Sequence, residues 1–200
     1  MALGLILASC TAEVKTDDKK EDTKEVETPV KEEVKEDVVA EYTADATASV
    51  INFTGNKVGE DDSHSGTVKI SEGSFTTTNG AVTAGTFVID MTSIDAGMEK
   101  LTSHLMADDI MNAAAFPTST FTITEGTATE VKGTLSVIGA ELPVTLAVTS
   151  TDADGVVTFT GTGSIDFVGT AASTLQHEEG AEKYISSEVP LVITLVGAKK

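Results

Sequence analysis

Hydrophobic and polar side chains alternate with a period of two along most of the chain beyond residue 42. The clearest stretches place apolar or glycine residues at positions 87, 89 and 91, at 131 to 137, at 142 to 148, at 157 to 161 and at 189 to 195, in steps of two. Such alternation, rich in Val, Ile and Thr, is typical of half-buried antiparallel strands. The spacing predicts an all-β domain of about eight strands, folded as a barrel or a sandwich.

Dipeptides that contain glycine separate these stretches and predict turns, notably Gly55-Asn56, Glu72-Gly73 and Asn79-Gly80. The alternation does not reveal which face of each strand points inward. An eight-stranded barrel is either filled by its own side chains or just wide enough for one ligand. A hollow barrel and a solid core therefore both remain open at this point.

One segment, residues 102–121, breaks the alternation. Leu101 and Leu105 fall at helical spacing, Ile110 follows about one turn further on, and Pro117 marks the end. The segment predicts a short helical insert around residues 97–113 that crosses one end of the sheet. The simplest role for it is to close the barrel with its apolar face buried.

The first ten residues end in the only cysteine of the chain, Cys10. The apolar run before it is too short to span a bilayer but suits the core of a secretory signal. Leu7-Ala8-Ser9-Cys10 resembles a bacterial lipobox, although no Lys or Arg precedes the run. We therefore expect residues 1–10 to be a lipoprotein signal, Cys10 to be lipidated, and the protein to be anchored in the bacterial envelope, on the periplasmic side of the outer membrane or on the cell surface.

Residues 11–41 contain six Lys, twelve Asp or Glu and no Gly. Dense charge with few apolar residues predicts a disordered tether, so the folded domain is expected over residues 42–200. The whole chain has a net charge of −19, and all its basic residues are Lys. This balance argues against nucleic-acid binding, which needs a basic surface.

Few residues suggest catalysis or metal binding. The three histidines, His64, His104 and His177, are scattered, and Asp61 and Asp62 beside His64 are better explained as a solvated loop. No nucleophile elbow or phosphate-binding loop is present in the sequence. We expect no enzyme activity, no metal and no cofactor; a hydrolase built on loops remains the least supported alternative.

Six short motifs occur in an order that resembles the YceI-like family of lipid- or polyisoprenoid-binding, lipocalin-like proteins of the bacterial envelope. They are IDMTSI (89–94), HLMADDI (104–110), FPTSTF (116–121), VKGTLSVIG (131–139), LPVTL (142–146) and SIDFVG (164–169). The resemblance covers roughly residues 42–197. It implies an eight-stranded antiparallel lipocalin-like barrel with an apolar tunnel and the helical insert near its mouth.

Three positions depart from the family's pattern. Thr102 stands where the family usually has Asp, Ile138 where it usually has His, and no Arg precedes Asp166-Phe167. The absent Arg removes a fixed bidentate donor, so a diphosphate head group is expected to bind less tightly here. A quinone or an acyl lipid is an alternative ligand to a polyisoprenoid.

The resemblance implies binding, for sequestration or transport, of a hydrophobic isoprenoid-type lipid in the barrel interior. The expected partners are this lipid and the membrane through the anchor, with a homodimer as a further option and no nucleic acid. A structural or adhesive surface module with a solid core and a protein partner is the alternative. The candidate lipid-binding residues, each of which could equally be ordinary core, are Phe53, Phe87, Ile89, His104, Leu105, Phe116, Phe121, Leu135, Val137, Phe159 and Phe167.

Overall fold

The computed structural model describes residues 36–153, 155–176 and 181–200. The predicted signal segment with Cys10, nearly all of the predicted tether, and His177 lie outside the described residues. The helices of the described ranges are all too short to cross a membrane.

Ten strands and two short helices follow one another in the described part of the chain. The strands are β1 (Val39–Ala44), β2 (Val50–Val58), β3 (Asp62–Thr78), β4 (Ala81–Asp95), β5 (Thr118–Gly126), β6 (Glu130–Val137), β7 (Ala140–Ala153), β8 (Val156–Asp166), β9 (Tyr184–Ile185) and β10 (Glu188–Lys199). Helix α1 (Glu99–Leu105) lies between β4 and β5, and the 3-10 helix η1 (Ser173–Leu175) precedes β9. The insert predicted around residues 97–113 is thus present, with its regular helix confined to α1.

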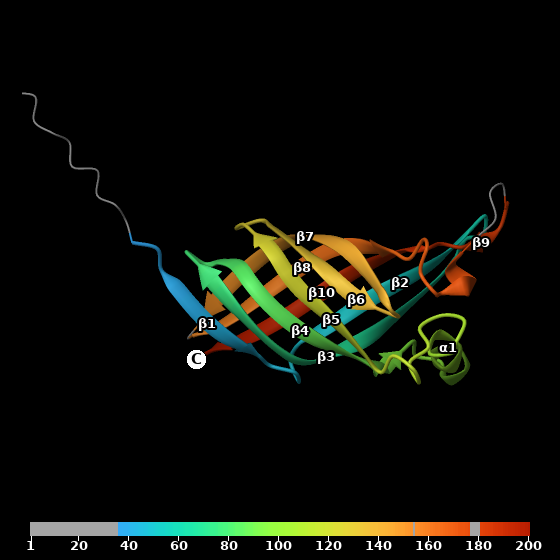
Figure 1. The fold of residues 1–200 in the computed structure, drawn as a ribbon, viewed down its shortest axis with the longest axis horizontal. Helices are drawn as coiled ribbons and strands as arrows, with labels where there is room; N and C mark the ends of the chain where they lie inside the picture. Colours follow the sequence, from blue (N-terminus) through green and yellow to red (C-terminus); the bar gives the residue numbers. More distant parts are fainter. Residues whose placement is uncertain (1–35, 154, 177–180) are drawn as a thin grey trace, which may run out of the picture. The chain divides into compact units, whose positions relative to one another are not determined.

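The strands close into one antiparallel barrel. Neighbours in the sequence pair from β2 through β8, β8 pairs with β10, and β10 pairs back with β2 through Thr194 and Val50. Eight strands form this closed wall, which confirms the predicted eight-stranded antiparallel barrel (Figure 1). Closure leaves these eight strands without an unpaired edge.

β1 and β2 occupy the same position in the wall, one after the other, between β3 and β10. Tyr42 of β1 pairs with Phe75 and Lys199, whereas Ile51 of β2 pairs with Val68 and Ile193 further along the same two strands. β1 begins at Val39, so the barrel starts before residue 42, within the segment predicted as tether. The reason is that the alternation extends back along β1, whose even-numbered side chains are its more buried ones.

Two of the predicted turns are wrong. Gly55-Asn56 lies inside β2, and Glu72-Gly73 lies inside β3. Gly73 pairs with Phe87, and a Cβ atom added to it would lie 2.4 Å from the Phe87 ring. Glycine is required there to seat an aromatic ring, not to turn the chain. Asn79-Gly80 is a turn as predicted, with both residues at positive φ, as type I′ hairpins require.

An aromatic cluster fills the barrel at the end where β1 begins. Phe75 stacks on Tyr42 with ring centroids 5.1 Å apart, meets Phe159 edge-on at 5.6 Å and lies 6.0 Å from Phe87. All four rings are buried. We call these four residues the aromatic floor, because Tyr42 lies on β1, and β1 is at the end of the barrel opposite α1 (Figure 1).

Candidate functional site

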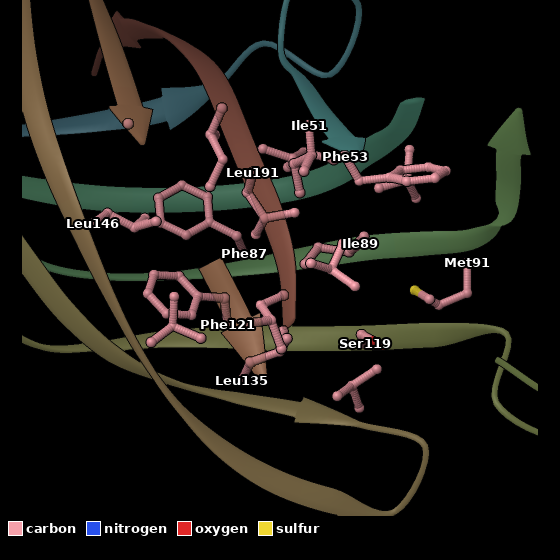
Figure 2. Close-up of a pocket in the computed structure, with 18 of the residues that line it drawn as sticks. Ile51, Phe53, Phe87, Ile89, Met91, Ser119, Phe121, Leu135, Leu146 and Leu191 are labelled. Carbon is pink, nitrogen blue, oxygen red and sulfur yellow. The ribbon is translucent and has the colours of Figure 1, made fainter. Parts of the chain in front are cut away.

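The barrel encloses a cavity of about 220 Å³. Its wall is made by inward-facing side chains from β2 through β10 and by the segments around α1 and η1. Figure 2 labels some of these side chains, from β2, β4, β5, β6, β7 and β10. The wall is almost entirely aliphatic and aromatic. The lining residues include Ile51, Phe53, Ile70, Phe87, Ile89, Met91, Phe121, Leu135, Leu146, Phe159, Phe167 and Leu191.

The strand pattern explains why these residues face the cavity. On β10, Val189, Leu191, Ile193 and Leu195 line it in steps of two, as a regular strand requires. β4 departs from the step of two, because a bulge lies between Asp90, which pairs with Lys69, and Asp95, which pairs with Thr67. Met91 and Ile94 both reach the cavity because of that irregularity.

The cavity wall contains no charged side chain among the residues that line it. Only two hydroxyl side chains reach it, those of Ser119 and Ser186. The Ser186 hydroxyl donates to the backbone oxygen of Glu188 at 3.0 Å and accepts from its amide at 3.2 Å. The Ser119 hydroxyl is buried and has no hydrogen-bond partner among the described residues.

The α1 end of the barrel is covered by two segments that are far apart in the sequence. Leu105, Ile110 and Met111 come from the insert, and Leu175 comes from η1; all four line the cavity. Asp109 joins the segments, since its carboxylate accepts from the Thr174 hydroxyl at 2.7 Å and its carbonyl accepts from the Thr174 amide at 3.0 Å. The hydroxyl bond holds the pKa of the Asp109 carboxyl below its usual value, because it favours the charged form.

Most of the partly exposed lining side chains lie at this same end. Phe53, Leu105, Met111, Ile185 and Val189 line it and are only half-buried. Toward the aromatic floor, by contrast, the lining side chains of Phe87, Phe159 and Leu195 are buried. The cavity therefore has a mouth beside α1 and a closed end at the floor.

Nine of the eleven candidate lipid-binding residues line the cavity. These are Phe53, Phe87, Ile89, Leu105, Phe121, Leu135, Val137, Phe159 and Phe167. The structure does not bring the other two to it. His104 is exposed in the last turn of α1, and the Phe116 ring lies over the turn at Gly139.

More than half of the residues that line the cavity were not among the candidates predicted from the sequence. The aliphatic residues of β10, together with Ile51, Val144 and Leu146, line the cavity but were not among the candidates. These residues follow the same alternation of apolar and polar positions. The alternation distinguishes the two faces of a strand but does not show which face points into the barrel. Ser119 was missed because a serine within a Thr-rich strand looks like an outward-facing position.

The acidic loop around residue 61 is part of the outer wall. Asp62 lies 3.0 Å from the Lys57 ammonium and 3.7 Å from His64, and all three side chains are exposed. This ion pair lowers the pKa of Asp62 and raises the pKa of Lys57. Within the described ranges, His, Cys, Asp and Glu side chains form no group able to hold a metal ion.

Comparison with known proteins supports the fold. A model of the YceI-like domain matches residues 42–196. The crystal structure of BcnA from Burkholderia cenocepacia is 20% identical, with a TM-score of 0.59 over 76% of this chain and 98% of that one. A polyisoprenoid binding domain from Saccharophagus degradans, implicated in plant cell wall breakdown, is 20% identical, with a TM-score of 0.55 over 80% of this chain and 98% of that one. No curated protein matched the chain.

Proposed function

The chain belongs to the YceI-like family, and from this premise we propose that it binds a hydrophobic isoprenoid-type lipid inside its barrel. The observation that carries the proposal is the cavity, which is enclosed by the wall, lined by apolar side chains and accessible beside α1. Burying apolar surface contributes about 25 cal/mol per Å², so a lipid chain needs few polar contacts to bind here. A similar barrel from Saccharophagus degradans is described as polyisoprenoid binding.

The same cavity favours binding over catalysis. Catalysis needs a nucleophile or a proton donor and acceptor positioned at the substrate, and the wall offers only two serine hydroxyls. The cavity also weighs against a structural module with a solid core, since such a core would fill this space with side chains.

The size of the cavity suggests how much of a lipid it holds. An apolar cavity of about 150 Å³ accommodates one benzene molecule, so the volume of about 220 Å³ holds on the order of ten carbon atoms. A prenyl chain of this order of size fits the space. Farnesol, with fifteen carbons, is therefore a suitable first probe.

Native mass spectrometry tests the proposal directly. The full chain carrying Cys10→Ser, which prevents confusion with a covalent lipid, would be purified from a bacterial host without detergent. We expect one lipid adduct per chain, extractable into organic solvent, and uptake of one farnesol after extraction. An unliganded mass that does not change when farnesol, a quinone or a fatty acid is added would disprove lipid binding.

We also propose that the protein is anchored in the bacterial envelope through a lipid on Cys10. The support is the Leu7-Ala8-Ser9-Cys10 sequence, which resembles a lipobox. Labelled palmitate supplied to bacteria that express the chain is expected to enter the wild-type protein and not Cys10→Ser. Equal labelling of the two, or none in either, would contradict the anchor.

A further inference from the structure

The Ser119 hydroxyl is the one polar side-chain group of the cavity wall whose hydrogen-bonding capacity is unused among the described residues. Ser186, the other hydroxyl, is engaged with Glu188. Ser119 has 3% of its surface exposed, and its oxygen has no partner. A serine hydroxyl can donate one hydrogen bond and accept others, and leaving it buried without a partner costs free energy.

The surroundings of Ser119 offer it nothing else. It lies on β5 opposite Ile89, close to Met91, whose amide is already bound to the Pro117 oxygen at 2.9 Å (Figure 2). Phe121 and Ile123 follow it into the cavity in steps of two, which places the Ser119 side chain on the inner face of the wall. An alanine or valine would satisfy the packing without an unpaired polar atom.

We infer that Ser119 is a binding residue for an uncharged oxygen group, a hydroxyl or a carbonyl, at the head of the lipid. This inference rests on the proposed lipid-binding function and narrows it to a class of ligand. The bound oxygen completes the hydrogen bonding of Ser119, while the apolar chain fills the space between Ser119 and the aromatic floor. Recognition of this kind is usual in apolar pockets, where a few polar groups fix the orientation of the ligand.

The position of Ser119 also sets the direction of the ligand. Ser119 is the second residue of β5, at the α1 end of that strand (Figure 1). The head group therefore lies inside the barrel near the mouth, with the tail pointing to the floor. A diphosphate is disfavoured at this depth, because burying its charge requires a cationic or hydrogen-bonded partner, and the lining residues include no Lys, Arg or His.

The test compares farnesol with farnesene, which has a similar fifteen-carbon skeleton and no hydroxyl. Dissociation constants for both are measured with the full chain carrying Cys10→Ser, with and without Ser119→Ala. We expect Ser119→Ala to weaken farnesol binding about tenfold and to leave farnesene within about twofold, as loss of one buried hydrogen bond implies. Comparing the two ratios removes the different cost of taking each probe out of water.

Two further variants control the experiment. Thr122→Ala removes a hydroxyl from the exposed face of the same strand and is expected to change neither constant. Ser119→Thr keeps the hydroxyl and is expected to retain the preference that Ser119→Ala loses. The ligand-free Ser119→Ala protein is expected to melt at a higher temperature, because it no longer buries an unpaired hydroxyl.

The possible outcomes distinguish a failure of the Ser119 inference from a failure of the proposed lipid binding. If Ser119→Ala changes the farnesol and farnesene constants by the same factor, Ser119 does not contact the head group. If farnesyl diphosphate binds as tightly as farnesol, the head group lies outside the barrel and the inference fails. If the protein with Ser119 binds neither farnesol nor farnesene, lipid binding itself is wrong.

Discussion

Replacing Gly161 by phenylalanine is expected to abolish lipid binding while leaving the barrel folded. Gly161 lies on β8, lines the cavity and pairs with Val148 and Ile193. A Cβ atom added there would lie 3.6 Å from the nearest Leu146 atom and 3.8 Å from Ile193, both ordinary contacts. Most other glycines of the wall have no such room; at Gly163 the added atom would lie 2.4 Å from the Thr145 oxygen.

The expected size of the effect follows from the space that the new ring occupies. An apolar cavity of about 150 Å³ holds a benzene ring, so a phenylalanine ring would fill most of the 220 Å³ available. Each methylene group kept out of the cavity loses about 0.8 kcal/mol of binding free energy. Exclusion of five carbons therefore weakens farnesol binding by about a thousandfold, measured by native mass spectrometry and by titration.

Thr162→Phe is the matched control, since its side chain is exposed on the outer face of the same strand. It is expected to bind farnesol like the wild type. Gly161→Leu is a smaller replacement that reports on the same space if the phenylalanine variant does not fold. Unchanged farnesol binding by a folded Gly161→Phe protein would show that the ligand binds elsewhere.

Phe75→Ala is expected to lower the free energy of unfolding by about 3–5 kcal/mol, the usual cost of removing a buried aromatic ring. Phe75 has 3% of its surface exposed and contacts three other rings of the aromatic floor. Aromatic pairs contribute beyond the area that they bury, so the loss affects Tyr42, Phe87 and Phe159 together. Urea unfolding followed by circular dichroism measures the change.

Tyr42→Phe is the control for this variant. It keeps the stacked ring and is expected to change the free energy of unfolding by less than about 1.5 kcal/mol, as volume-conserving core substitutions do. Phe75→Ala also deepens the cavity at its closed end, so the variant should bind longer prenyl alcohols relatively better than farnesol. A loss of stability no larger than that of Tyr42→Phe would show that the floor does not act as a unit.

The closed barrel could be predicted from the sequence, because alternation, β-branched residues and the motif order all agree. The direction of each strand face could not. Leu135 and Val137 were among the candidates through their motif, whereas Leu191 and Ile193 show the same alternation and were not. Only the pairing of the strands decides that all four residues share the interior.

The turn predicted at Gly73 was wrong for a physical reason. Gly73 looks like a turn residue, but in a barrel packed with aromatic rings a glycine also makes room for a ring on the neighbouring strand. Added Cβ atoms would lie 2.4 Å from a phenylalanine ring at four positions, Gly66 on Phe53, Gly73 on Phe87, Gly133 on Phe121 and Gly197 on Phe75. Such pairs join residues distant in sequence, so local composition does not reveal them.

His104 and Phe116 show that a motif shared with a family does not by itself identify the residues that line the cavity. Both belong to motifs that place them near the mouth, and both lie there, yet neither reaches the cavity. α1 contains no buried residue, and the insert meets the cavity through Leu105, Ile110 and Met111 instead. Which side chains of such an irregular segment turn inward depends on tertiary contacts such as the bond between Asp109 and Thr174.

The chain enters the barrel at Val39, beside the aromatic floor and at the opposite end from the mouth (Figure 1). The barrel therefore has two ends with different tasks: one joins the N-terminal segment, and the other admits a ligand, so a change at the point where the chain enters the barrel leaves the ligand entrance untouched.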